Sequence, residues 1–327
     1  MLFCAALAGA ALILLLGSSA NCGAQAQRAA PLPAASPSAT ANPQAAFDAQ
    51  RAWELLLAQT NFGPRNPGSE GHERCLRWLL EQMRSVADRA FLQEFTHTST
   101  EMAPGKTFRM ANVVGVIAAG RTGPARRVLL CAHWDTRPIA DCDPNPANRT
   151  KPILGANDGA SGVAVCLEVA RALRVKRAPT EVVVVLFDGE DFGKGQNEEW
   201  FLGSKYFARH MGELRPARGI LLDMVGDADL RLEWEAYSLL ADRELMETIW
   251  FRAGALGFRR AFPLRSRPTA SVLDDHIPLI EAGVPTVDLI DFDYPYWHTL
   301  QDTPDKCSAA SLRAVGETVL AVLRRGI

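Results

Sequence analysis

The sequence predicts an α/β fold with a mostly parallel, twisted open sheet and helices on both faces. Short apolar runs rich in β-branched residues are typical of buried parallel strands; they occur at Arg127–Cys131, Val182–Phe187, Ile220–Leu222 and Val284–Ile290. Segments with helical periodicity separate these runs, as in strand–helix–strand units. Acidic and imidazole side chains follow the runs, at the edge of the sheet where open α/β folds bind their ligands.

Five segments carry apolar residues at helical spacing. These predicted helices are Phe47–Ala58, His72–Val86, Val163–Leu173, Arg243–Leu256 and Ala309–Leu323. A loop rich in Gly and Pro, Asn61–Gly71, separates the first two. Either Asn157 or Asp158 stands where its side chain can cap the start of the third helix. Helix capping is therefore an alternative to a functional role for Asp158.

The first 46 residues differ in composition from the rest of the chain. Leu2–Leu16 is apolar and is followed by small residues, which is typical of a secretory signal peptide. We therefore expect residues 1–26 to direct export to the periplasm or the exterior. An uncleaved membrane anchor and a lipidated Cys22 are the alternatives. Residues 27–46 are rich in Ala, Pro and Ser, which predicts a linker, and residues 47–327 are predicted to form the single folded domain.

Composition bears on the kind of partner to expect. The chain has 327 residues, of which 48% are hydrophobic, and a formal net charge of −2. This length supports one large core, and the scattered Lys and Arg residues form no basic stripe of the kind that binds nucleic acid. We therefore expect no nucleic-acid partner, no stable membrane partner and a monomer.

The predicted domain has an odd number of cysteines, namely Cys75, Cys131, Cys142, Cys166 and Cys307. Export permits disulfides, but an odd number leaves at least one thiol without an internal partner. Their spacing matches no zinc–cysteine pattern. We assign them to packing or to a bridge.

Side chains of the metal-binding type stand at or beyond the ends of the predicted strands. They are His133, Asp158, Glu190, Asp191, Asp223 and His298. Zinc binds imidazole nitrogen and carboxylate oxygen, and a catalytic zinc site combines three protein ligands with an open position. We therefore expect Zn²⁺ as the cofactor, with Asp158, Asp191 and His298 as its ligands.

Three other carboxylates are candidates for acid–base chemistry. Glu190 and Asp191 are adjacent, so their side chains leave the backbone in different directions. Asp191 can hold the metal while Glu190 faces the substrate as a proton carrier. Asp223 ends an apolar strand, and a buried carboxylate is costly without a partner. Asp274 is a candidate partner, because two carboxyl groups at one site can share a proton.

Several motifs resemble those of the mammalian-type glutaminyl-peptide cyclotransferases and of the related co-catalytic zinc aminopeptidases. The matching motifs are Arg65-Asn66-Pro67-Gly68-Ser69, His133-Trp134-Asp135, Asp188-Gly189-Glu190-Asp191, Gly203-Ser204-Lys205-Tyr206, Asp274-Asp275-His276-Ile277-Pro278 and Trp297-His298-Thr299. The resemblance runs from about Phe62 to near the C-terminus and implies a zinc-aminopeptidase-like fold.

The cyclotransferase resemblance implies an acyltransferase. It would convert the N-terminal glutamine of peptides and proteins to pyroglutamate, with release of ammonia, using one zinc ion. Glu190 would carry the proton from the attacking amine to the leaving ammonia. Asp223 and Asp274 would form a hydrogen-bonded pair. Trp297 would wall the pocket around the glutamine side chain.

The aminopeptidase resemblance implies two zinc ions. His133 and Asp223 would bind the second ion, and Asp158 would bridge both. Glu190 would activate a metal-bound water that cuts the first peptide bond. In the cyclotransferase, by contrast, His133 would support the site without binding metal. A metal-free binding protein of the transferrin-receptor type is a third class, which the complete set of ligands disfavours.

Asp274 and Trp297 favour the cyclotransferase. The aminopeptidases usually have Ser at the position of Asp274, and an acid there competes with a second metal for Asp223. They also tend to have a smaller or non-indole residue at the position of Trp297.

Two features depart from the animal cyclotransferases. The loop Phe192–Phe201 has only Trp200 as a substitute for their loop tryptophan. Asp191 also replaces a Glu, which shortens this ligand by one methylene.

Overall fold

The computed structural model describes residues 43–120, 126–195, 199–264 and 271–327. The predicted signal peptide, Cys22 and the linker up to residue 42 lie outside the described residues. The backbone carbonyls of Gln44 and Ala46 accept hydrogen bonds from Arg171 at 2.5 and 2.7 Å, so the end of the predicted linker packs on the domain. Among the described residues, no helix combines the length and apolar character needed to cross a bilayer.

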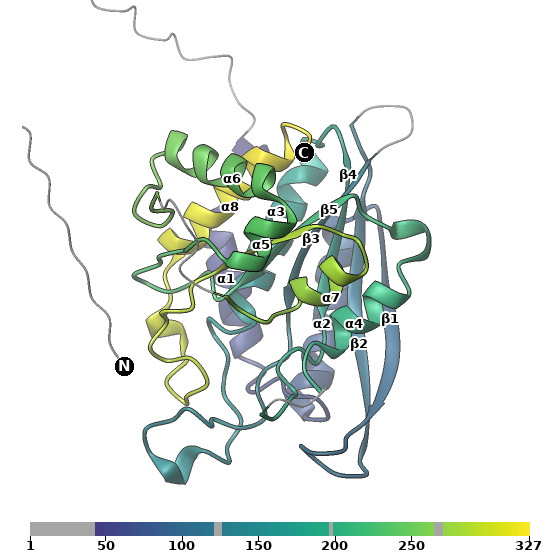
Figure 1. The fold of residues 1–327 in the computed structure, drawn as a ribbon, viewed down its shortest axis with the longest axis vertical. Helices are drawn as coiled ribbons and strands as arrows, with labels where there is room; N and C mark the ends of the chain where they lie inside the picture. Colours follow the sequence, from purple (N-terminus) through teal and green to yellow (C-terminus); the bar gives the residue numbers. More distant parts are fainter. Residues whose placement is uncertain (1–42, 121–125, 196–198, 265–270) are drawn as a thin grey trace, which may run out of the picture. The chain divides into compact units, whose positions relative to one another are not determined.

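A six-stranded sheet lies at the centre of the fold, with the order β1-β2-β4-β3-β5-β6 (Figure 1). Its strands are β1 (Arg89–Thr98), β2 (Thr107–Ile117), β3 (Arg127–His133), β4 (Glu181–Phe187), β5 (Arg218–Asp223) and β6 (Thr286–Ile290). The neighbours β4, β3, β5 and β6 are parallel, which confirms the four predicted strands. β2 pairs antiparallel with both β1 and β4. β1 has no buried residue, so it lacks the continuous apolar signal of a buried strand.

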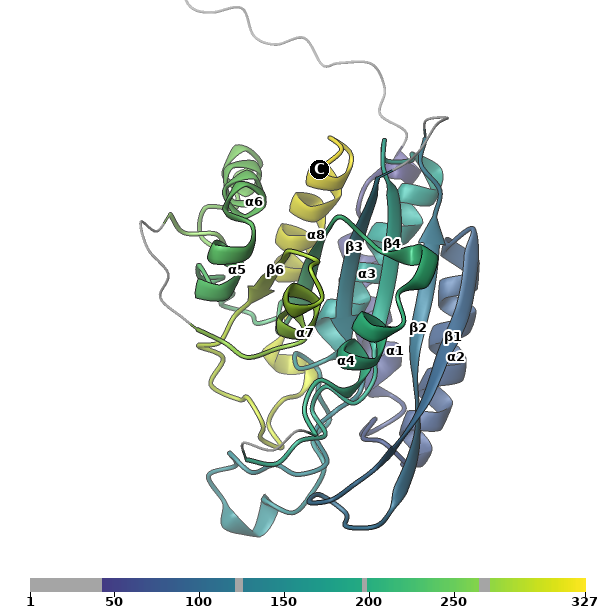
Figure 2. The same cartoon turned by 45° about the vertical axis from the view of Figure 1, so that its right-hand side comes forward.

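Helices cover both faces of the sheet (Figures 1 and 2). They are α1 (Ala49–Thr60), α2 (Glu70–Val86), α3 (Ala160–Val175), α4 (Leu202–Arg209), α5 (Ala236–Ala241), α6 (Arg243–Ala255), α7 (His276–Glu281) and α8 (Ala309–Leu323). α1, α2, α3 and α8 share one face, and α4 packs with α7 on the other. α5 lies against β6, and α6 packs on α8. The five predicted helices are all present.

The central strands contribute to two cores. Successive residues of a strand point to opposite faces of the sheet. In β3, Leu130 and Ala132 join the core beneath α3, whereas Leu129 and Cys131 join the core beneath α4 and α7. All four side chains are buried. Burial on both faces explains why the predicted strands are continuously apolar rather than alternating.

Gly162 allows α3 to approach the ends of β3 and β5. A Cβ atom at this position would lie 2.2 Å from the carbonyl oxygen of Leu222 and 2.9 Å from the Cβ of Ala132. We expect Gly162→Ala to lower the free energy of unfolding by about 1–3 kcal/mol, because the helix must move away from the sheet. Chemical denaturation measures this change.

Gly120→Ala is the matched control. Gly120 is exposed, and the nearest atom to an added Cβ lies 3.2 Å away on Arg177. The control should change stability far less than Gly162→Ala. Equal losses in the two variants would show that the close approach of α3 is not the cause.

Candidate active site

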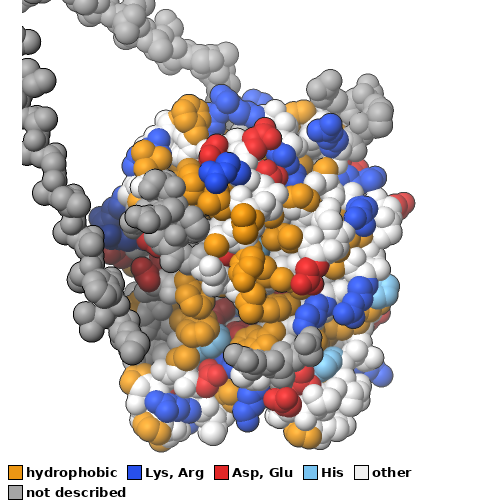
Figure 3. Space-filling model, viewed as in Figure 1, with side chains coloured by type: hydrophobic (Ala, Val, Ile, Leu, Met, Phe, Trp, Pro, Cys, Tyr) orange, Lys and Arg blue, Asp and Glu red, His pale blue; other side chains and the backbone are white. Residues whose placement is uncertain are grey.

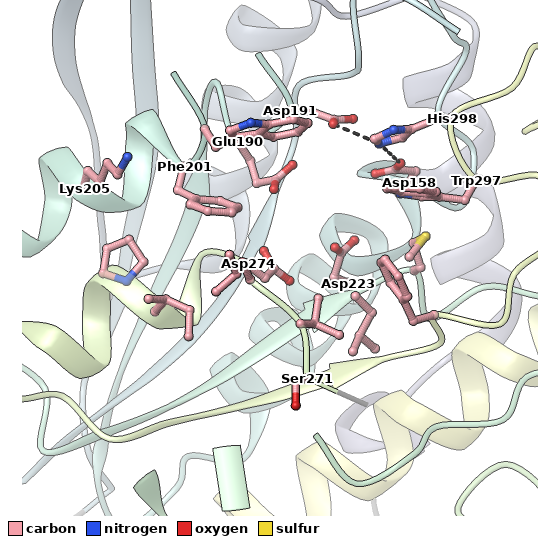
Figure 4. A pocket seen from close by; sticks show the side chains of 18 of the residues that line it. Asp158, Glu190, Asp191, Phe201, Lys205, Asp223, Ser271, Asp274, Trp297 and His298 are labelled. Atoms are coloured by element: carbon pink, nitrogen blue, oxygen red, sulfur yellow. Dashed lines mark ion pairs between the residues drawn. The ribbon is translucent and has the colours of Figure 1, made fainter. Parts of the chain in front are cut away.

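A cavity of about 680 Å³ opens at the carboxyl ends of the parallel strands. It is lined by seven of the predicted site residues, namely Asp158, Glu190, Asp191, Asp223, Asp274, Trp297 and His298. Figure 4 shows the carboxyl groups of Glu190, Asp223 and Asp274 turned toward one open space, with His298 above it. The eighth predicted residue, His133, is 1% exposed and contacts this group from beneath. Tertiary folding thus brings the predicted residues together.

Asp158, Asp191 and His298 form a group that fits a zinc ion. The Nε2 atom of His298 lies 3.1 Å from Asp191 Oδ1 and 3.6 Å from Asp158 Oδ2 (Figure 4). One ligand atom from each residue falls within 4.8 Å of the others. Asp158 Oδ2 and Asp191 Oδ2 are buried and accept no hydrogen bond, which is costly unless a cation completes the site. One nitrogen and two carboxylate ligands with an open cavity match a catalytic zinc centre.

His133 forms a second group with Asp158 and Asp223. Its Nε2 atom lies 3.1 Å from Asp158 Oδ1 and 3.2 Å from Asp223 Oδ1. Burial by itself would lower the pKa of His133, but the charge of Asp223 and the bonds to Asp158 raise this pKa well above its usual value. Nε2 of His133 is thus within hydrogen-bonding distance of both carboxyl groups. The same positions also suit a second metal ion, so geometry is compatible with either predicted role of His133.

Asp135 positions the turn that carries Glu190 and Asp191. Its buried carboxylate accepts the backbone N–H of Glu190 at 3.1 Å and that of Asp191 at 3.3 Å. Gly189 precedes them with φ of 73°, and an added Cβ would lie 2.8 Å from a sulfur atom. The result is the predicted divergence: Asp191 reaches His298, and Glu190 faces the cavity. Asp135 belongs to a recognised motif, but its role depends on contacts that sequence does not reveal.

Asp158 is positioned by its backbone and does not cap α3. The helix begins at Ala160 with Gly159 as the N-cap, and no side chain makes a capping hydrogen bond. The capping alternative for Asp158 is therefore wrong. Instead, the carboxylate of Asp302 accepts the backbone N–H groups of Asn157 and Asp158 at 2.8 and 3.1 Å. The side chain of Asp158 is left to face His133 and His298. Asp302 was not among the predicted residues.

Asp274 interacts with one more carboxyl group than expected. One carboxyl oxygen of Asp274 lies within 4.8 Å of one of Asp288, but Asp274 Oδ2 and both oxygens of Asp288 are buried without a hydrogen-bond partner among the described residues. Burial, followed by the charge of Asp288, raises the pKa of Asp274 well above its usual value. Burial and the charge of Asp223 do the same for Asp288. Two carboxyl groups at one site can share a proton, so Asp288 is a further candidate partner of Asp274 beside the expected Asp223.

Aromatic rings wall the cavity above the metal ligands. Trp297 stacks on His298 with ring centroids 3.8 Å apart, and Trp200 lies parallel to His298 at 6.5 Å. Both tryptophans line the cavity, and Trp200 stays a candidate substitute for the loop tryptophan of the animal cyclotransferases. Among the described residues, the non-glycine residues with positive φ are Phe201, Met224 and His298, and all three line the cavity. Such strained backbone is typical of functional sites.

The mouth of the cavity is apolar. Leu273 is 64% exposed and Phe292 is 46% exposed, and both line the cavity. Figure 3 shows apolar side chains gathered near the middle of the face that carries α5 and α7 in Figure 1. A peptide that extends out of the cavity would meet this apolar surface.

Four of the five cysteines in the described ranges serve packing. All five cysteines of the described ranges are free thiols. Cys75, Cys131, Cys166 and Cys307 are buried, and Cys142 is exposed. The alternatives were packing and a disulfide bridge, and the four buried cysteines therefore serve packing.

Fold and site together define a member of the zinc-peptidase-like class. The chain belongs to peptidase family M28, whose sequence model matches residues 112–323. This membership confirms the zinc-aminopeptidase-like fold predicted above.

Individual relatives include both expected activities. The glutaminyl cyclase of Tannerella forsythia is 35% identical, with a TM-score of 0.80 over 86% of this chain and 100% of that chain. A glutaminyl-peptide cyclotransferase-like protein of Mus musculus is 28% identical over 73% of this chain and 66% of its own length. Aminopeptidase YwaD of Bacillus subtilis is 26% identical over 66% of this chain and 44% of its own length. The chain thus spans less than two thirds of either curated relative.

Proposed function

We propose that this chain is a zinc-dependent glutaminyl-peptide cyclotransferase, which converts the N-terminal glutamine of peptides or proteins to pyroglutamate and releases ammonia. The observation that carries the proposal is the carboxyl group of Asp274, which lies in the cavity beside Glu190 and Asp223 (Figure 4). Aminopeptidases of this fold usually have Ser at this position. The similarity to the Tannerella forsythia glutaminyl cyclase over its full length supports the same choice.

The substrate glutamine fits the cavity with its side chain toward the metal ligands. Zinc bound by Asp158, Asp191 and His298 would act as a Lewis acid toward the γ-carbonyl oxygen of the glutamine. Trp297 and Phe201 provide flat apolar walls for the aliphatic part of the side chain. Such walls exclude water, which favours attack by the internal amine over hydrolysis.

Glu190 is the proposed proton carrier. The α-amine nitrogen of the substrate attacks the γ-carbonyl carbon and forms the ring C–N bond, and Glu190 accepts the proton that the amine loses. The same carboxyl then gives this proton to the side-chain nitrogen, which leaves as ammonia when its C–N bond breaks. Burial, with the charge of Asp191, raises the pKa of Glu190 well above its usual value. A raised carboxyl pKa suits a group that must both accept and donate a proton near neutral pH.

Asp274 is proposed to act as a neutral hydrogen-bond donor. A carboxylic acid that burial keeps protonated can donate a hydrogen bond to a substrate oxygen or nitrogen. Burial, with the charges of Asp288 and Asp223, raises the pKa of Asp274 well above its usual value, which favours this form. Asp223 lies 3.2 Å from His133 through Oδ1, and its charge also raises the pKa of Asp274.

Mass spectrometry of a glutamine-initiated peptide, after incubation with the zinc-loaded protein, tests the proposal. Loss of one ammonia with every residue retained is the expected result. Release of the first residue with addition of water would instead identify an aminopeptidase. A peptide with N-terminal Ala serves as the control, because it has no γ-amide to cyclise and can react only by hydrolysis.

The aminopeptidase remains the second candidate because His133, Asp158 and Asp223 are close enough to hold another ion. Zinc content separates the two functions. With one zinc ion, His133→Ala is expected to retain the zinc content of the unsubstituted protein, since His133 would contact ligands but not metal. Elemental analysis of the purified variant measures this. A variant with one zinc ion fewer would favour the two-zinc aminopeptidase.

A further inference from the structure

Arg137 is a fully buried arginine whose contacts all lead to the candidate zinc centre. It is 1% exposed. Its Nη1 atom donates to the backbone carbonyls of Asp191 at 3.1 Å and Gly193 at 3.0 Å, and it lies 3.5 Å from Asp191 Oδ1. The guanidinium therefore holds one predicted zinc ligand through both its backbone and its side chain. Burying a cation is costly unless it is paired and hydrogen-bonded in this way.

The other edge of the Arg137 guanidinium holds Asp141. Nε donates to Asp141 Oδ1 at 2.8 Å, and Nη2 donates to Oδ2 at 2.6 Å. A paired, two-bond contact of this kind fixes the plane of a carboxylate more firmly than a single bond. Asp141 Oδ1 lies in turn 3.5 Å from the Nδ1 atom of His298. The ring atom Nε2 of His298, on the opposite side, faces Asp158 and Asp191.

Trp200 completes the same assembly. The Arg137 guanidinium lies over its ring at 4.5 Å, a cation–π contact. The indole N–H of Trp200 donates to the carbonyl of Gly195 at 3.0 Å. An added Cβ at Gly193 would lie 2.3 Å from the Trp200 ring, so the ring fits only over a glycine. Trp200 is also parallel to the ring of His298.

We propose that Arg137 and Asp141 are positioning residues of the zinc centre. Asp141 accepts the Nδ1 proton of His298, which leaves Nε2 with its lone pair toward the metal. Arg137 fixes Asp141, Asp191 and Trp200 in one unit. Metal-binding histidines in proteins commonly donate their second ring N–H to a carboxylate, and loss of that partner typically weakens metal binding about 10–100-fold. The inference rests on the zinc site of the proposed function, but it does not depend on the reaction that the site performs.

Asp141→Ala is the decisive variant, because the Asp141 side chain is 39% exposed and faces His298 directly; thermal unfolding of the metal-free variant measures any stability lost by leaving Arg137 without this partner. We expect a zinc dissociation constant about 10–100-fold higher than that of the unsubstituted protein, measured by competition with a chelator. We expect a smaller increase for Arg137→Lys, because a lysine keeps the charge but cannot bond Asp141 and the two carbonyls together. The ¹⁵N signal of His298 Nδ1 should move in Asp141→Ala, which a general loss of stability would not cause.

Glu317→Gln is the matched control. Glu317 pairs with Arg313 across the same i,i+4 spacing on α8, far from the cavity in sequence, and its loss should leave zinc affinity unchanged. Asp141→Ala with the zinc affinity of the unsubstituted protein would overturn the inference. The thiol of Cys142 also lies within 4.8 Å of a ring nitrogen of His298. A loss of zinc affinity in Cys142→Ala but not in Asp141→Ala would therefore assign His298 Nδ1 to the thiol and overturn the inference. An unsubstituted protein without zinc affinity would contradict both this inference and the proposed function, whereas a zinc-binding protein that fails to cyclise would contradict the proposed function alone.

Discussion

Replacement of Glu190 by glutamine is expected to leave zinc binding intact and to lower turnover by about 10²–10⁴-fold. Glu190 lines the cavity but is not one of the three residues that fit the metal. Glutamine keeps the size and hydrogen-bonding reach of the side chain, but it cannot accept the proton of the attacking amine. Steady-state kinetics on a glutamine-initiated peptide, together with zinc analysis, measures both effects.

Asp191→Ala provides the contrast to Glu190→Gln, because Asp191 is adjacent in sequence and contacts His298. It should lose zinc as well as activity. If Glu190→Gln lost its zinc and Asp191→Ala kept it, the roles assigned to the two neighbours would be exchanged. Full activity of Glu190→Gln would remove Glu190 from the reaction altogether.

Asp158→Asn is expected to abolish activity by removing zinc. The two oxygens of Asp158 face different histidines: Oδ1 lies 3.1 Å from His133 and Oδ2 lies 3.6 Å from His298. This residue therefore belongs to both groups that fit a metal ion. Its neutral replacement is a poor zinc ligand, since zinc binding in these groups relies on carboxylate charge. Zinc titration followed by thermal unfolding should show no zinc-dependent rise in Tm.

The metal-free form of Asp158→Asn should be more stable than the metal-free unsubstituted protein at neutral and higher pH. Burial, with the charge of Asp191, raises the pKa of Asp158 from 3.8 to about 7. A carboxyl whose pKa is raised by folding binds its proton more tightly in the folded state. Its contribution to stability is therefore lost as the pH rises from about 4 to about 7. Thermal unfolding of both metal-free proteins across this range tests the sign. A variant that is less stable at about pH 8 would mean that the charge of Asp158 stabilises the metal-free fold.

The fold could be predicted where burial leaves a continuous mark on the sequence. The runs at Arg127, Val182, Ile220 and Val284 are apolar because both faces of β3, β4, β5 and β6 are covered by helices. The strand β1, by contrast, is half-buried and exposed at the edge of the sheet. The sequence of β1 therefore could not be distinguished from that of a surface segment, and its pairing with β2 could not be predicted.

The meeting of the candidate metal-binding residues could be predicted in part because the place of a residue at a strand end fixes its place in space. His133 and Asp223 are the last residues of β3 and β5, and Asp191 follows the end of β4. Residues at the carboxyl ends of parallel neighbours necessarily meet at one edge of the sheet. The residue types then indicated a metal, because carboxylates and imidazoles gathered in a buried place need a cation.

By itself, then, the sequence determined the parallel strands and indicated the acidic and imidazole residues that gather at one edge of the sheet, since buried strands leave a continuous apolar mark and these residue types stand out beyond them. Only the tertiary structure showed which residues position the side chains of the candidate site through hydrogen bonds. Asp302 bonds Asn157, 145 residues away, and Arg137 joins the carbonyl of Asp191, 54 residues away, to Asp141. A single buried polar residue leaves no periodic pattern, because its role depends on which distant backbone groups the fold brings within hydrogen-bonding distance.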